Sequence, residues 1–105
     1  MIRRVSDAHI RDLTLTILSR GCDVTNYLIL KELPTTTSQL RRRIGLSKMP
    51  FYRRINRLAQ VGLLQHERGS GTLLKTEITE RFIALIEVIN REVAQRVKSG
   101  HRERR

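Results

Sequence analysis

Residues 36–61 hold the pattern that most restricts the fold, because they predict two helices joined by a tight turn. Thr36 and Gln39 form a capping box, in which Thr36 accepts an early helix N–H and Gln39 reaches back to the Thr36 N–H. Gly45 ends this first helix. Ser47 caps a second helix over about residues 48–61, with Pro50 in its first turn, where a missing N–H costs nothing.

The second of these helices has two chemically different faces. At about 100° per residue, Phe51, Ile55 and Leu58 align on one side, together with Gly62. The other side is rich in long hydrogen-bond donors, so we predict an apolar inner face and a polar outer face. The outer residues are Met49, Arg53, Asn56 and Gln60, flanked by Tyr52 and Arg57.

The N-terminal part of the chain predicts two further helices. The first covers residues 7–19, begins at a Ser6 or Asp7 cap and stops at Gly21. The second covers about residues 24–33, with Asp23 or Thr25 as its cap, and cannot extend through Pro34. Its apolar residues are Tyr27, Leu28, Leu30 and Leu33.

The C-terminal part predicts a hairpin and a long helix. Strand patterns at residues 63–67 and 72–78 are joined by Gly69-Ser70-Gly71, whose glycines can supply a positive φ. Thr79 caps a final helix over about residues 80–98. The polar, basic tail at 99–105 is predicted to be mobile.

We therefore predict a mainly α fold with a small β-hairpin in one domain, residues 1–105. Its parts are an N-terminal helix at 1–22, a core at 23–79, a C-terminal helix at 80–98 and the basic tail at 99–105. At this length a chain buries a modest core.

Positive charge is concentrated in one third of the chain. The whole sequence carries a formal charge of +11, and residues 33–66 contain seven Arg and Lys residues with neither Asp nor Glu. A solvated basic face is the plain alternative. An acid-free stretch of this length within predicted helices favours a polyanionic partner, and hence nucleic acid.

The order of elements between residues 27 and 79 resembles a known family. Leu46-Ser47, the apolar positions Ile55, Leu58 and Val61, and Gly62-Leu63-Leu64 leading into a strand are similar to the winged helix-turn-helix domain of ArsR-like and MarR-like prokaryotic transcription regulators. Residues 63–78 resemble the wing. The resemblance covers about half the chain and is a pattern of spacing, so it is more specific for fold than for family.

The resemblance implies that the helix after the turn enters the major groove of double-stranded DNA. The base-contacting residues would then be Lys48, Met49, Pro50, Tyr52, Arg53 and Asn56. Arg53 suits guanine and Asn56 suits adenine, whereas Tyr52 has the alternative of shielding the core edge. Phosphate or wing contacts would come from Arg41, Arg42, Arg43, Arg54, Arg57, Arg68 and Lys75. Arg54 has the alternative of packing over the domain without contacting DNA, and Arg68 that of lying in solvent.

The terminal helices predict a homodimer. The apolar stripe of the last helix exceeds what one small domain needs, and in related folds such helices pair across a two-fold axis. The predicted contact residues are Ile10, Leu13, Ile17, Phe82, Ile86, Ile89, Val93 and Val97. The alternative is that both helices pack only on their own domain.

Nothing in the sequence predicts a reaction, a metal or a cofactor. Metal sensors among ArsR-like proteins carry cysteines on the helix before the recognition helix, and residues 38–43 contain neither Cys nor His. Cys22 is interpreted as a buried or idle thiol rather than a redox switch. The lack of a long apolar run and of a signal peptide predicts a cytoplasmic protein.

The function predicted from these observations is that of a sequence-specific transcription regulator, acting as a repressor on an inverted repeat. One alternative is a plasmid or viral partition factor, or a chromatin-like DNA-binding protein. The other is a winged-helix adaptor that binds protein or RNA. The sequence indicates no small-molecule effector.

Overall fold

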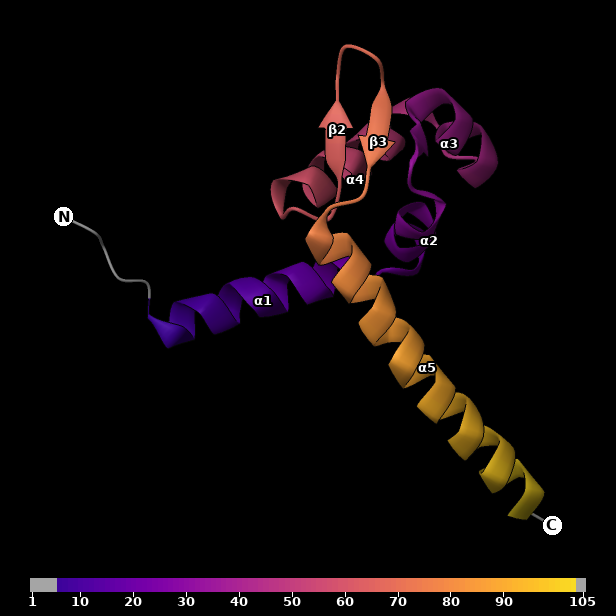
Figure 1. Cartoon of the computed structure of the whole chain (residues 1–105). Coiled ribbons are helices and arrows are strands. Elements are labelled where there is room, and N and C mark those ends of the chain that lie inside the picture. Colours follow the sequence, from indigo (N-terminus) through magenta and orange to yellow (C-terminus); the bar gives the residue numbers. More distant parts are fainter. Residues whose placement is uncertain (1–5, 104–105) are drawn as a thin grey trace.

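The computed structural model describes residues 6–103 and is mainly helical with a small three-stranded antiparallel sheet (Figure 1). The predicted mainly α class is confirmed. The elements in chain order are α1 (Asp7–Gly21), α2 (Val24–Glu32), β1 (Thr35–Thr36), α3 (Thr37–Ile44), α4 (Lys48–Gln60), β2 (Gln65–Glu67), β3 (Thr72–Leu74) and α5 (Glu77–Glu103).

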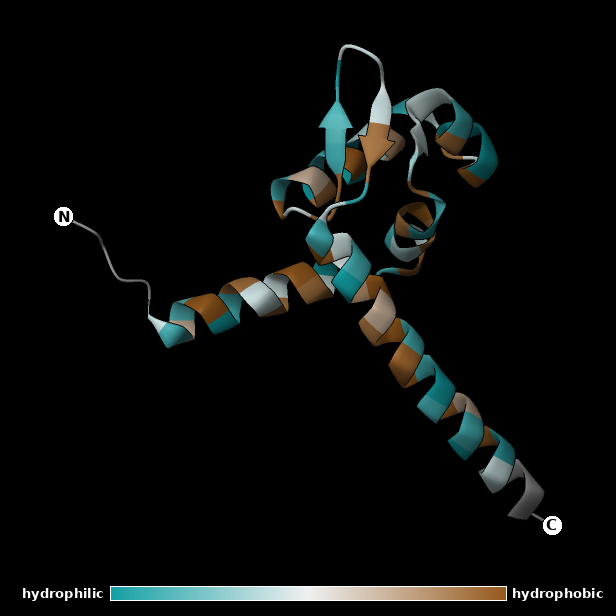
Figure 2. Cartoon of the chain, viewed as in Figure 1, coloured by the Kyte–Doolittle hydropathy of each residue, from teal (hydrophilic) through white to brown (hydrophobic). Residues whose placement is uncertain are grey.

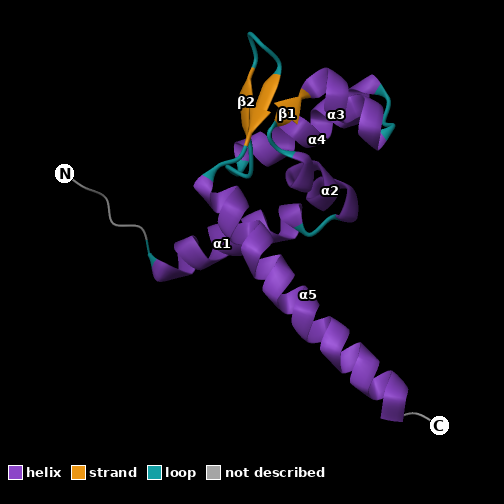
Figure 3. Cartoon of the chain, turned by 45° about the vertical axis from the view of Figure 1, so that its right-hand side comes forward, coloured by secondary structure: helices purple, strands orange, loops and turns teal. Residues whose placement is uncertain are grey.

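The sheet has the strand order β1-β3-β2, with both pairs antiparallel (Figure 3). The predicted hairpin forms β2 and β3. In the central strand β3, Leu73 pairs with Thr35 of β1 on one side and with His66 of β2 on the other. Strand β1 was not predicted, because two residues cannot show an alternating pattern. It draws α3 toward the hairpin, since the Thr37 N–H donates to the Gly71 carbonyl at 2.9 Å.

The core lies between α2, α3, α4, the hairpin and the first turns of α5. Leu40 of α3 and the predicted inner face of α4 are buried there. Of the apolar residues named for α2, Leu30 and Leu33 are buried but Leu28 is 50% exposed, and Ile29, which was not named, is fully buried. The buried apolar residues are Ile29, Leu30, Leu33, Leu40, Phe51, Ile55, Leu58, Leu63, Leu64, Leu73 and Phe82.

The short helices are fixed by their ends. The Asp23 side chain accepts the Asn26 N–H at 3.0 Å and so caps α2, while Thr36 accepts the Gln39 N–H at 3.3 Å and caps α3. The other half of the predicted capping box differs, since the Gln39 side chain accepts the Thr35 hydroxyl. Gly45 ends α3 with a φ of 79°, a value that glycine adopts without strain.

The start of α5 differs from the prediction. Thr76, not Thr79, is the cap: the Thr76 hydroxyl accepts the Thr79 N–H at 3.1 Å, and the Thr79 hydroxyl accepts the Thr76 N–H at 3.0 Å. Thr79 is buried and also bonds the Leu63 carbonyl. Strand β3 therefore ends at Leu74 rather than at residue 78.

The far end of α5 also differs from the prediction. The helix continues beyond residue 98 to Glu103, so residues 99–103 are helical. Residues 104–105 lie outside the described part of the chain.

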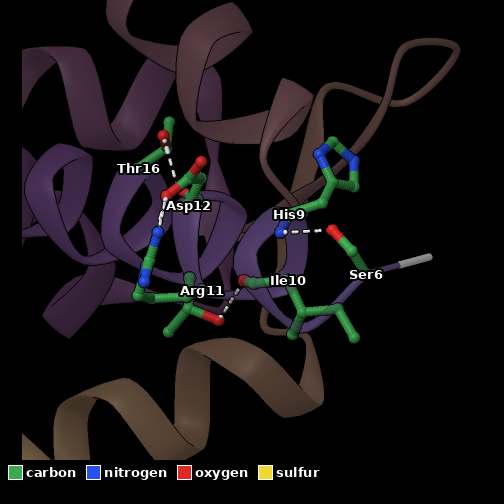
Figure 4. A network of polar contacts seen from close by, with 7 residues as sticks. Ser6, His9, Ile10, Arg11, Asp12 and Thr16 are labelled. Carbon is green, nitrogen blue, oxygen red and sulfur yellow. Dashed lines mark hydrogen bonds and ion pairs between the residues drawn. The ribbon is translucent and has the colours of Figure 1, made fainter.

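Helix α1 is held by local hydrogen bonds at its start and by close packing at its end. The Ser6 side chain accepts the His9 N–H at 3.1 Å, and the Thr16 hydroxyl donates to the Asp12 carbonyl (Figure 4). At the other end, Gly21 touches the Phe82 ring so closely that a Cβ on Gly21 would lie 2.5 Å from the Phe82 Cζ. The helix ends at the predicted Gly21. This glycine is needed because α1 approaches the Phe82 ring closely there, and its backbone is not left-handed.

Helices α1 and α5 project from the body in different directions (Figure 1). The radius of gyration is 17.0 Å, whereas a compact chain of this length would have about 13 Å. Apolar bands continue along both projecting helices (Figure 2). The molecule is thus a small packed body with two helical arms.

Candidate functional site

Helix α4 presents a polar face opposite its buried face. Phe51, Ile55 and Leu58 anchor it in the core, and no residue of α3 or α4 is acidic. Of the predicted base-contacting residues, Lys48, Met49, Arg53 and Asn56 are exposed, with Met49 at 72%, while Pro50 and Tyr52 are partly buried. The exposed face therefore offers several donors on a rigidly held helix.

Tyr52 lies at the edge of the core and beside a basic depression. Its ring meets the Phe51 ring edge to face, with centroids 5.2 Å apart and planes at 83°. This contact matches the alternative in which Tyr52 shields the core. The ring also lines a depression of about 420 Å³ between α3 and α4, whose other residues are Thr37, Ser38, Arg41, Arg42 and Lys48.

The three consecutive arginines of α3 have different surroundings. Arg41 is partly buried and Arg42 is exposed, and both line the depression beside Tyr52. Arg43 instead forms an ion pair with Glu32 of α2. Two of the three therefore face the depression, and the third has a carboxylate partner within the chain.

Arg54 is held inside the protein's own polar network, which does not fit its predicted phosphate role. Its guanidinium donates to Asp23 Oδ1 at 2.8 Å and to Asn26 Oδ1 at 3.0 Å. The Asn26 backbone N–H, and then the Arg54 charge, hold the pKa of Asp23 below its usual value. Arg54 thus fastens α4 to the start of α2.

The other predicted phosphate residues lie in three places. Arg57 is exposed on the α4 face, and Arg68 is exposed in the turn of the hairpin. Lys75 follows β3 at the base of the hairpin. The pKa of Glu87 of α5 is lowered mainly by Lys31, and the charge of Lys75 adds a smaller part. Lys75 is therefore at the opposite end of the hairpin from Arg68.

Arg20 is a residue of the candidate site that was not predicted from the sequence. It lies in the last turn of α1, and its guanidinium donates to the Arg57 carbonyl of α4 at 3.2 Å. The two residues are 37 positions apart, and no periodic pattern connects them. A single arginine in the last turn of a helix is also common for reasons of helix polarity.

The arms expose most of the residues predicted for a dimer contact. Ile10, Leu13, Ile89, Val93 and Val97 are exposed, while Ile17 and Ile86 are partly buried. Phe82 corrects the prediction, because it is only 3% exposed and belongs to the core. Near the body the arms enclose an apolar groove of about 450 Å³, lined by Thr14, Ile17, Leu18, Glu77, Ile78, Arg81, Phe82 and Leu85.

The remaining candidate residues show no assembled chemistry. Within the described part of the chain, no three His, Cys, Asp or Glu side chains gather in an arrangement that could hold a metal ion. Cys22 was predicted to be a buried or an idle thiol; it is exposed, so the buried alternative is wrong. Between residues 6 and 103, no helix combines the length and apolar character needed to cross a membrane.

Comparison with known proteins adds no identification. No protein-family model matches the sequence, and neither the curated proteins nor the solved structures include a match.

Proposed function

We propose that this protein is a sequence-specific, double-stranded DNA-binding transcription regulator with a winged-helix body. The observation that carries the proposal is the exposed, acid-free face of α4, which places Arg53 and Asn56 on a helix anchored by buried residues. Rigid placement matters, because base recognition depends on side chains held in a fixed position relative to the groove.

The dimensions and chemistry of α4 support insertion into the major groove. An α-helix with its side chains is about 10–12 Å across, and the major groove is about 12 Å wide. Arg53 would bind the O6 and N7 of guanine with two hydrogen bonds, and Asn56 would bind adenine. Met49, at the exposed start of the helix, would contact a thymine methyl group.

Phosphate contacts would come from the elements beside α4. Arg41 and Arg42 line the depression at the start of α3, where their guanidinium groups would bind a phosphate of one strand. Arg68 in the hairpin turn would reach the neighbouring minor groove or a phosphate. These contacts would set the position of the body on the duplex without reading its sequence.

The exposed apolar arms support a homodimer. Ile89 is 49% exposed and Val93 is 50% exposed on the same stripe of α5, and α1 adds Ile10 and Leu13. A two-fold axis through such a contact would present two copies of α4 to one face of the duplex, about one helical turn apart. Binding to an inverted repeat would then repress transcription by occluding the promoter.

The proposal is tested by comparing Arg53→Ala with Arg41→Ala on a preferred duplex and on a random duplex. We expect Arg53→Ala to lose about 1–3 kcal/mol on the preferred site and much less on random DNA. Arg41→Ala should weaken both duplexes alike and reduce the salt dependence.

Equal losses on both duplexes for Arg53→Ala would instead assign Arg53 to phosphate. That result would favour a sequence-independent DNA-binding protein over a regulator.

A further inference from the structure

A second basic depression lies on the other side of α4 from the one beside Tyr52. It measures about 430 Å³ and is formed where the end of α1 and the start of α2 meet α4. Four arginines and a single carboxylate line it. The lining residues are Arg20, Asp23, Asn26, Pro50, Arg53, Arg54 and Arg57.

The carboxylate in this depression is already neutralised by the protein itself. Asp23 accepts hydrogen bonds from Arg54 and from the Asn26 N–H. Asn26 is buried; its side-chain amide donates to the Arg20 carbonyl at 2.9 Å and its Oδ1 accepts from Arg54. The hydrogen-bonded residues Arg54, Asp23 and Asn26 therefore have no net charge together, and they link α1, α2 and α4.

The other three arginines keep their positive charge unpaired. Arg20 uses a guanidinium N–H to bind the Arg57 carbonyl, which fixes its position and leaves further donors free. Within residues 6–100, no ion pair involves Arg20, Arg53 or Arg57. Because Arg53 is assigned to guanine, the guanidinium groups of Arg20 and Arg57 remain at this polar depression and together make a site for an oxyanion.

We propose that this depression binds a phosphate of the DNA backbone, with Arg20 and Arg57 as its ligands. The assignment rests on the proposed function. It follows from the position of the two depressions, since Tyr52 and Arg54 are two residues apart and so point about 200° apart around α4. A helix in the major groove has a phosphate backbone on each side, so each depression would meet one strand.

The site is tested by replacing Arg20, a residue of α1 that no base contact requires. We expect Arg20→Gln to lower affinity about tenfold on preferred and random duplexes alike. It should also reduce the slope of log affinity against log salt by about 0.9 per subunit. Arg11→Gln is the matched control, because it removes the same charge from the other side of α1, where Arg11 pairs with Asp12.

A second variant separates binding from structure. Arg20→Lys keeps the charge, so it should restore the salt slope while its thermal unfolding stays close to that of Arg20→Gln. If Arg20→Lys lowers the affinity and the salt slope as much as Arg20→Gln does, Arg20 only links α1 to α4 and does not bind phosphate. The proposed phosphate site would then be wrong.

Two further outcomes would overturn the inference in distinguishable ways. If the wild-type protein binds DNA and Arg20→Gln behaves like Arg11→Gln, the depression is not a phosphate site and the proposed function stands. If the wild-type protein binds no duplex at low salt, the proposed function and this site both fall.

Discussion

The body and the two arms of this molecule use apolar residues in opposite ways. In the body, Phe51, Ile55 and Leu40 are fully buried, and no buried side-chain polar atom in the described residues lacks a hydrogen-bond partner. Along the arms, large residues such as Ile89 and Val93 stay half exposed. The body is thus packed within one chain, whereas the arms carry apolar surface that a single copy leaves open to water.

The largest effect expected from this comparison is in the body. Phe51→Ala should lower the free energy of unfolding by about 3–5 kcal/mol, because it leaves a cavity beneath α4. Met49→Ala, on the exposed face of the same helix, should change it by less than about 0.5 kcal/mol. Chemical denaturation measures both, and similar losses for the two variants would mean that α4 is not anchored as described.

The next largest effect is expected in the arms and concerns the association of two copies of the chain. Ile89→Asp should halve the mass measured by sedimentation, because it places a charge in the proposed contact between two copies. Gln95→Glu, which adds the same charge at an exposed position on the opposite side of α5, is the matched control. An unchanged mass for Ile89→Asp, or a monomeric wild-type protein, would remove this stripe of α5 from the interface.

The junction between body and arms should respond to a single methyl group. Gly21→Ala should destabilise the protein by about 1–2 kcal/mol, because the new Cβ collides with the Phe82 ring and this outweighs the better helix propensity of alanine. Gly100→Ala, in open space on α5, should be neutral or stabilising in the same thermal unfolding measurement. A stabilised Gly21→Ala variant would show that α1 and α5 can move apart freely.

The smallest effect is an exposed ion pair between body and arm. Lys31 Nζ of α2 lies 2.8 Å from Glu87 Oε2 of α5. This hydrogen bond and the attraction of the two charges lower the pKa of Glu87 and raise the pKa of Lys31. Because the pKa of Glu87 is lower in the folded protein, its charge stabilises the fold at pH values above the unfolded-state pKa of about 4.3. This stabilisation is lost as the pH falls through the pKa of the folded state.

Glu87→Gln should therefore lower the Tm slightly near neutral pH and leave it unchanged in strong acid, where the wild-type carboxyl is protonated. A loss of Tm that is the same at both pH values would show that the charge of Glu87 has no part in it.

The features of the fold that could be predicted from the sequence are those with a local cause. The two faces of α4 follow from helical spacing, and Gly45 marks the end of α3 through its own backbone preference. Residues 27–30 are apolar or aromatic at every position, so the pattern alone could not choose between Leu28 and Ile29. Packing against the body decided that Ile29 is buried.

The features that could not be predicted depend on contacts between distant residues. Thr76 and Thr79 are equally good caps by chemistry, and only the folded chain shows that Thr76 precedes the helix and accepts the Thr79 N–H, while Thr79 is buried and bonds the Leu63 carbonyl. In the candidate site, the exposed Arg53 was expected from spacing, but the pairing of Arg54 with Asp23 was not. Arg20 reaches α4 only because of the fold, so no sequence pattern indicated it.

The most direct test of the central claim is selection of bound duplexes from a random pool at moderate, fixed salt, followed by sequencing. The proposed function predicts convergence on an inverted repeat whose half-sites lie about one helical turn apart. Retention of duplexes without convergence would contradict sequence-specific regulation. Failure to retain any duplex would contradict DNA binding altogether.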